Sequence, residues 1–196
     1  MVPNSSTRGR LLVATPPLDD PNFDRTVVYM LEDHDQGAVG VVINRPSDAP
    51  SDELSLDGPA AGATSLAGWL ECVTAPATLF VGGPVGDDSL LAVARGHGRR
   101  DGCWGTVTGD IGTVDLSQEP NDVADRIDCV RFFQGYSGWS AGQLDAEIAA
   151  GAWMVFDADP DDVFHQTPWT LWRDVLRRQG GRLRWIADAP DDLSAN

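Results

Sequence analysis

Lysine is absent from this 196-residue chain, and all 14 of its basic residues are arginine. Without lysine the chain cannot form a Walker A phosphate loop, a Schiff base, a pyridoxal phosphate anchor or a serine–lysine dyad. Cysteine is scarce as well, because Cys72, Cys103 and Cys129 are the whole complement and form no C-x-x-C pair. This odd number of cysteines favours a reducing compartment and argues against a zinc site.

Long apolar runs are also missing. No stretch of the chain approaches the roughly 20 apolar residues that a membrane-spanning helix needs. Residues 1–10 lack the apolar core of a secretory signal. We therefore expect a cytoplasmic protein with no membrane partner, folded as a single domain over residues 1–196, with flexible ends at 1–8 and 188–196.

Positive charge is scarce, since 30 acidic residues against 14 arginines give a net charge of −16. Such an excess repels the phosphate backbone, so direct nucleic-acid binding is not expected. Residues 167–186 reverse the balance with five arginines against one aspartate. A solvated helix face is the ordinary explanation, and Arg173, Arg177 and Arg178 are the candidate surface for an acidic protein partner.

The most distinctive stretch is Gly135-Tyr-Ser-Gly-Trp-Ser-Ala-Gly-Gln-Leu-Asp-Ala-Glu-Ile148. Residues 130–134 before it are β-branched and aromatic and predict a strand, which the glycines of 135–138 then end in a turn. Ser140 is the predicted N-cap of a following helix, and Gln143 is expected to accept a hydrogen bond from the Ser140 backbone N–H. The stretch therefore reads as strand, turn and capped helix.

Packing and chemistry compete as explanations of these residues. Trp139 and Leu144 have the spacing of a hydrophobic staple, whereas Glu147 is expected to point away from the packed face. The free N–H groups of a helix N-terminus can instead hold an anion. Ser137 begins a pattern like a nucleophile elbow, but Trp139 stands where that motif needs glycine. Packing is the favoured explanation.

Other candidates are weaker. The Gly82–Pro84 turn can expose N–H groups to an anion, although a tight turn is the commoner use. The polar residues 32–37 predict a hairpin loop, and consecutive residues such as 32–35 rarely converge on one metal ion. His34, His97 and His165 are isolated in the sequence. We predict no catalytic residue, no metal and no cofactor.

Strands dominate the pattern, in an order with helices that favours one α+β domain. Residues 26–31 and 38–43 are apolar on both faces and predict two buried strands. Residues 46–68, rich in Pro, Ser, Ala, Gly and Asp, predict a surface excursion. Residues 167–179 predict the last helix, ended by Gly180 and Gly181, with a buried face made of Trp169, Trp172 and Leu176.

Several blocks in order carry a family resemblance over nearly the whole chain. They are residues 20–29, 37–46, 80–85 and 135–148, and the Phe-x-x-x-Pro-x-x-x-Trp ending at Phe164, Pro168 and Trp172. Together they resemble the AlgH/YqgE family of bacterial proteins. The resemblance implies a single compact α+β domain with a strongly bent mixed β-sheet flanked by helices. Many family members carry a label as transcriptional regulators, but no catalytic residues can be transferred from them.

The resemblance and the residues together give two functional hypotheses. The first is a non-enzymatic cytoplasmic binding or regulatory module with a protein partner. The alternative is a protein or enzyme that binds a small anionic ligand, such as a nucleotide or phosphate, at the turns 82–84 and 135–142. The candidate ligand-binding residues are Asn44, Gly82, Gly83, Gly138, Trp139, Ser140 and Gln143.

Overall fold

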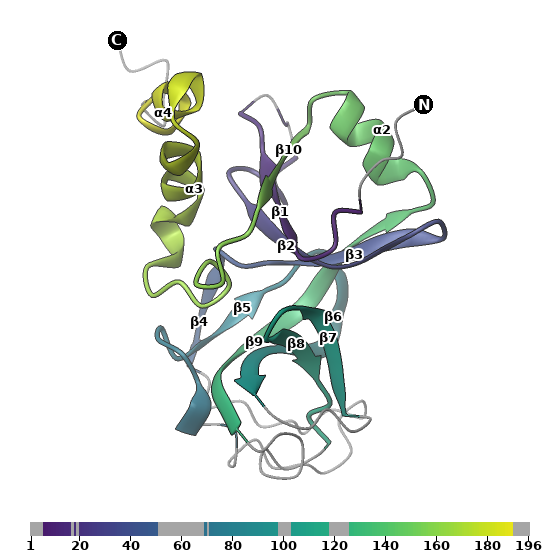
Figure 1. Cartoon of the computed structure of the whole chain (residues 1–196), viewed down its shortest axis with the longest axis vertical. Helices are drawn as coiled ribbons and strands as arrows, with labels where there is room; N and C mark the ends of the chain where they lie inside the picture. Colours follow the sequence, from purple (N-terminus) through teal and green to yellow (C-terminus); the bar gives the residue numbers. More distant parts are fainter. Residues whose placement is uncertain are drawn as a thin grey trace.

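The computed structural model describes residues 6–16, 18, 20–50, 69, 71–97, 103–117 and 126–189. Across these residues ten strands form one curled, half-barrel sheet with short helices packed against it (Figure 1). In chain order the strands are β1 (Arg10–Ala14), β2 (Val27–His34), β3 (Gly37–Val42), β4 (Pro46–Pro50), β5 (Thr78–Val81), β6 (Val85–His97), β7 (Trp104–Thr108), β8 (Ile111–Val114), β9 (Arg126–Ser140) and β10 (Trp153–Asp157). The helical elements are α2 (Gln143–Ala149), the 3-10 helix η3 (Pro168–Thr170), α3 (Leu171–Gln179) and α4 (Gly181–Ala187).

The sheet follows the order β10-β1-β2-β3-β9-β6-β8-β7, and β5 joins it by pairing with β4 and β9. The β5–β9 pair is parallel, and the neighbours along the main path are antiparallel, so the sheet is mixed. In Figure 1 the strands β1, β2, β3 and β10 occupy the upper part and β5 to β9 the lower part. The predicted bent α+β sheet is confirmed.

Strand β9 links the two parts of the sheet. Its first portion pairs with β6, as in Leu91 with Phe133, and its last portion pairs with β3, as in Gly40 with Ser137. Residues 135–138 therefore belong to a strand, and the predicted turn there is wrong. The glycines permit the strand to bend and to pass close to a neighbour, a use of glycine that sequence cannot distinguish from a turn.

The two strands predicted to be buried, at 26–31 and 38–43, are largely buried in β2 and β3. Alternation along β1 sends Leu11 to one side, into the cluster with Tyr29 and Trp172 of α3. Leu12 points to the other side, into the cluster with Trp139. Helices α2 and α3 flank this part of the sheet in Figure 1. The two covered faces explain why these strands are apolar throughout.

The C-terminal region departs from the prediction in two ways. The predicted helix does end at Gly180, which is the C-cap of α3, but it is not the last helix, because α4 begins at Gly181. The second difference is Trp169, which is 64% exposed, whereas Trp172 and Leu176 are buried. Trp169 lies in η3, ahead of α3, so the helical spacing that placed it on the buried face does not apply.

Two predicted segments are only partly described. The predicted excursion at 46–68 begins instead with β4, which pairs with β5, and residues 51–68 lie outside the described residues. Of the predicted flexible ends 1–8 and 188–196, residues 1–5 and 190–196 also lie outside them. In the described part of the chain, no helix is both long enough and apolar enough to cross a bilayer.

Candidate functional site

Glu147 is the centre of the distinctive stretch, although the sequence predicted that it would point away. The indole Nε1 atoms of Trp139 and Trp153 both donate to Glu147 Oε2, each at 2.8 Å. Gln143 Nε2 donates to the other carboxylate oxygen at 2.9 Å. Trp139 and Trp153 are 6% and 3% exposed and pack against each other edge to face. One carboxylate thus accepts the hydrogen bonds of two buried indole N–H groups.

Gln143 and Ser140 form the predicted hydrogen bond, but Ser140 is not the N-cap of the helix. The Ser140 backbone N–H donates to Gln143 Oε1 at 3.1 Å, and the Ser140 hydroxyl donates to the same oxygen at 3.0 Å. Ser140 is nevertheless the last residue of β9, and the N-cap of α2 is Gly142, with φ 73°. The predicted capping role of Ser140 is therefore wrong, because the strand continues to Ser140 and delays the helix.

The two glycine-rich segments pack against each other instead of opening to solvent. A Cβ atom added to Gly82 would lie 2.3 Å from the carbonyl oxygen of Gly135. The Ser137 hydroxyl, which is buried, donates to the Gly82 carbonyl at 3.1 Å, and the Gly82 N–H donates to Gln134 O at 2.8 Å. The turn at 82–84 and β9 thus form a close backbone crossing.

The remaining candidates of the ligand set have structural contacts. Asn44 Oδ1 accepts a hydrogen bond from the Val27 N–H at 2.8 Å, and Asn44 Nδ2 donates to Arg25 O at 2.9 Å. A Cβ added to Gly138 would lie 3.4 Å from the Tyr136 ring. Asn44 therefore ties the segment before β2 to the end of β3.

The three candidate arginines of the partner surface bind within the chain. Arg178 forms a two-bond pair with the buried Asp162 at 2.9 and 2.7 Å, and this contact raises the arginine pKa. Arg177 contacts Asp188 at 2.8 Å and Asp174 at 3.3 Å. Arg173 donates to the carbonyl oxygen of Ala187. These contacts hold α3, α4 and the preceding turn together.

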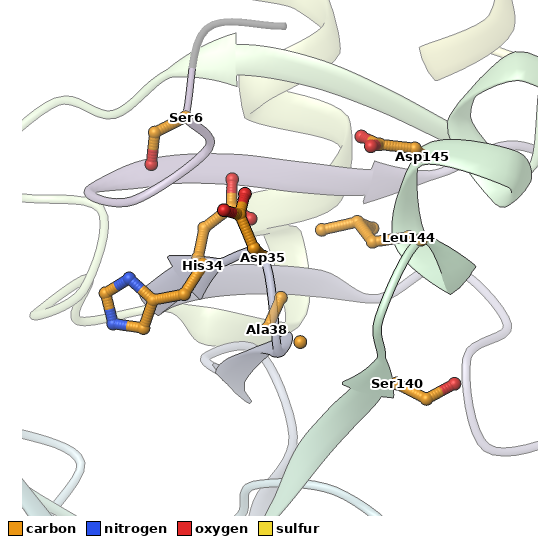
Figure 2. A pocket seen from close by; sticks show the side chains of 10 residues that line it. Ser6, His34, Asp35, Ala38, Ser140, Leu144 and Asp145 are labelled. Carbon is orange, nitrogen blue, oxygen red and sulfur yellow. The ribbon is translucent and has the colours of Figure 1, made fainter.

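A polar cavity of about 430 Å³ lies between the β2–β3 hairpin and the start of α2 (Figure 2). Its lining is Ser6, Asp33, His34, Asp35, Gly37, Ala38, Ser140, Gly142, Leu144 and Asp145. In Figure 2 the carboxylates of Asp35 and Asp145 face the same open space, and the His34 ring turns away from it. Of the predicted ligand residues, only Ser140 lines this cavity.

The N-terminal segment forms part of the cavity wall. Asp33 accepts hydrogen bonds from the Thr7 N–H at 2.6 Å and the Thr7 hydroxyl at 2.9 Å, which places Ser6 at the cavity. Strand β2 extends to His34, so the predicted loop over 32–37 reduces to a tight turn. Among the described residues no group of three or more His, Cys, Asp or Glu side chains has the arrangement of a metal site.

The three cysteines are free thiols. Burial is the main cause that raises the pKa of Cys72 and of Cys129 above the ordinary thiol value. A thiol with a raised pKa stays protonated at neutral pH and is a weak nucleophile. Burial thus works against the thiolate form, which is the nucleophilic form, at these two residues.

Arg131 is a buried cation that the sequence did not mark. It is 1% exposed and donates to the carbonyl oxygens of Val163 at 2.7 Å, Ala75 at 2.9 Å and His165 at 3.2 Å. Its guanidinium lies 4.3 Å from the centre of the Phe80 ring. Burial lowers its pKa to about 10. Arg131 thus joins β9 to the segment that precedes η3.

We expect the substitution Arg131→Lys to lower the free energy of unfolding by about 2 kcal/mol, because an ammonium cannot match the planar fork that reaches several carbonyls. Urea denaturation followed by fluorescence measures the change. The matched control is Arg10→Lys, whose partner Asp157 is almost fully exposed, and its expected loss is below about 0.5 kcal/mol. Equal losses in the two variants would contradict the structural role of Arg131.

Comparison with known proteins gives a consistent match over the whole length. The sequence model of a family described as AlgH-like matches residues 11–184. A UPF0301 protein of Streptomyces avermitilis is 44% identical over 197 residues, covering 98% of this chain and 96% of the relative. A UPF0301 protein of Thermobifida fusca is 46% identical over 201 residues, covering 97% and 96%.

Solved structures share the fold. The crystal structure of a protein from Corynebacterium diphtheriae superposes with a TM-score of 0.83 at 27% identity, covering 96% of this chain and 95% of that chain. The solution structure of the AlgH protein from Pseudomonas aeruginosa gives a TM-score of 0.67 at 27% identity, covering 98% and 100%. The curled sheet with its flanking helices is therefore shared by both proteins.

Proposed function

The chain belongs to the AlgH-like family, and we propose that it is a cytoplasmic binding module that holds a positively charged group of a protein partner. The proposed site is the cavity between the β2–β3 hairpin and α2. The observation that carries the proposal is the composition of this cavity, which is concave and polar and is lined by three aspartates, Asp33, Asp35 and Asp145, the first of which also accepts hydrogen bonds from Thr7. Concave sites with a few convergent polar groups are the usual form of binding sites.

The charge of the residues that line the cavity favours a positively charged ligand. His34 is the one lining side chain that can carry a positive charge, and its ring faces away from the cavity. The chain as a whole carries a net charge of −16, which attracts cationic groups from a distance. A guanidinium or ammonium group fits this environment better than the phosphate or nucleotide considered for the glycine-rich turns. Helix α2 has only seven residues, and its first turn carries Asp145, which disfavours an anion there.

The side chains near the cavity support binding rather than catalysis. Ser137 is buried and its hydroxyl donates to the backbone carbonyl of Gly82, so its proton is directed to a carbonyl oxygen, whereas a nucleophile is activated by a base. Trp139 and Gln143 direct their polar atoms to Glu147. These two residues therefore have a structural role next to the cavity, whose own lining is acidic.

A triarginine peptide is the probe for this proposal. We expect it to shift the backbone amide signals of Gly37 and Gly142 in ¹H–¹⁵N correlation spectra and to bind less tightly as salt is added. The double substitution Asp35→Asn with Asp145→Asn is expected to weaken binding about tenfold, which corresponds to ~1.4 kcal/mol.

The matched control removes the same charge elsewhere. Asp87 and Asp88 are exposed on β6 and do not line the cavity. The variant with Asp87→Asn and Asp88→Asn is expected to change the affinity less than twofold, since only the general attraction is reduced. Equal weakening in both double variants would show that the peptide responds to net charge alone, and the proposed site would be rejected.

A further inference from the structure

Helix α4 has an outer face that is both aromatic and cationic. Trp185 is 82% exposed, more than any other large hydrophobic side chain that the structure describes. Arg182 is also exposed and lies three residues earlier, so the two side chains are neighbours on one face of the helix. Leu183 and Ile186 pack against the main core cluster instead. The fold therefore holds α4 by its apolar side and leaves Arg182 and Trp185, which we call the α4 face, in solvent.

Arg182 differs from the other arginines in having no partner for its guanidinium. Every other arginine whose side chain the structure describes forms a hydrogen bond, an ion pair or a ring contact within the chain. Arg178 pairs with Asp162, and even the exposed Arg184 approaches Asp188 at 4.0 Å. An unpaired arginine beside an exposed tryptophan has the composition of a binding hot spot, in which these two residue types are enriched.

The acidic cavity of the same chain has the complementary chemistry. Asp33, Asp35 and Asp145 line it, and Ala38 and Leu144 add apolar surface to the lining. Carboxylates are the geometric match for a guanidinium, and aliphatic side chains pack well against an indole. The net charge of −16 disfavours the other acidic occupants of a cationic face, because it repels the phosphates of nucleic acids and of anionic lipids.

The α4 face lies away from the cavity of its own chain. In Figure 1 α4 is at the upper left beside α3, whereas α2, which borders the cavity, is at the upper right, and β1 and β10 lie between them. Arg173 of α3 donates to the Ala187 carbonyl and so holds the end of α4 in place. Only another molecule can therefore bring a cationic face to the cavity, and a second copy of this chain carries one.

We propose that two copies of the chain pair reciprocally, with Arg182 of each copy in the acidic cavity of the other and Trp185 packed against Leu144. This inference rests on the proposed binding of a cationic group by the cavity and names the partner. A two-fold arrangement satisfies both contacts at once and is the commonest symmetry of oligomers. The second contact then forms within an existing pair, which strengthens two small interfaces. The pairing is reversible and weakens as salt is added.

Sedimentation velocity over a range of protein concentrations tests the pairing. We expect the sedimentation coefficient of the parent protein to rise from that of a monomer to that of a dimer. Arg182→Glu and Trp185→Ser are each expected to raise the dissociation constant of the dimer at least tenfold. The matched control is Arg184→Glu, the same charge change on α4 but two positions away and outside the α4 face, and its expected effect is less than about threefold.

A charge exchange between two variants tests whether the two surfaces meet. One variant carries Asp35→Arg with Asp145→Arg, and the other carries Arg182→Glu. Each alone is expected to stay monomeric, because like charges then face each other at both contacts. Their equimolar mixture is expected to form a mixed dimer, since each contact again joins opposite charges.

The outcomes separate this inference from the proposed function. A parent protein that stays monomeric but binds the triarginine peptide would overturn the pairing and leave the cation-binding cavity in place. A dimer that forms equally well with both cavity aspartates replaced by arginine, or a mixture of the two variants that stays monomeric, would also overturn it. A parent dimer that the triarginine peptide dissociates would support both proposals, because the peptide and Arg182 then compete for one cavity.

Discussion

Replacing Glu147 with alanine is expected to lower the free energy of unfolding by about 3–5 kcal/mol, since an unpaired buried donor costs roughly 1–3 kcal/mol and two indole N–H groups lose their acceptor at once. Both groups, from Trp139 and Trp153, donate to the same oxygen at 2.8 Å. Their rings also pack on Phe23, with centroids 6.4 and 5.2 Å away, so the loosening spreads through the aromatic cluster.

Tryptophan fluorescence during urea denaturation measures this loss, and near-UV circular dichroism reports the packing of the two indoles. The control is Asp145→Ala on the same helix, where an exposed acid is replaced and the expected change is within about 0.5 kcal/mol. A Glu147→Ala variant as stable as this control would show that the indole contacts contribute nothing to folding.

Replacing Gly83 with alanine is expected to lower the free energy of unfolding by about 3 kcal/mol or more, because steric overlap and backbone strain act together. The added Cβ would lie 2.3 Å from the backbone carbon and oxygen of Tyr136, and φ at Gly83 is +152°. The neighbours are backbone atoms of β9, which cannot move aside without disturbing the sheet.

The matched control for Gly83 is Gly109→Ala. Gly109 also has a positive φ, of +52°, but a Cβ there would meet nothing within 4 Å. Only strain remains in this variant, with an expected cost of about 1–2 kcal/mol. Denaturant unfolding of the two variants separates the clash from the strain, and a Gly83→Ala variant no less stable than Gly109→Ala would refute the close crossing.

The sequence patterns indicated a different role for each of the two residues in these predictions. Glu147 was expected to point away from the packed face, and Gly83 to lie in a turn that could expose N–H groups to an anion. In the run at 135–142, the predicted hydrogen bond from the Ser140 N–H to Gln143 is present. The run was nevertheless assigned to a turn, since glycines that end a strand and glycines that let two strands cross look alike in one dimension. Gly83 and Gly135 meet only because β9 bends beside the 82–84 turn.

The C-terminal helices also show that local sequence patterns predict local structure but not contacts between distant residues. The apolar spacing of Trp172 and Leu176 predicted a buried helix face correctly, because that spacing is a local property of an α-helix. Trp169 lies one turn earlier, where the chain is a 3-10 helix, and it projects into solvent. The arginines of this region were visible as a charge excess, but their partners Asp162 and Asp188 depend on how the turns fold back.

The amino-acid sequence was sufficient for the α+β class, the buried strands and the chemistries that a chain without lysine excludes, because these depend on composition and local periodicity. It was sufficient for the family through the resemblance of its ordered sequence blocks. The acidic cavity and the contacts of Glu147 and Arg131 depended on the folded chain. Asp35 and Asp145 are 110 positions apart and meet at one cavity only after β3 pairs with β9. Sites of this kind are built by non-local pairing, and a linear pattern carries no record of which distant residues the sheet will bring together.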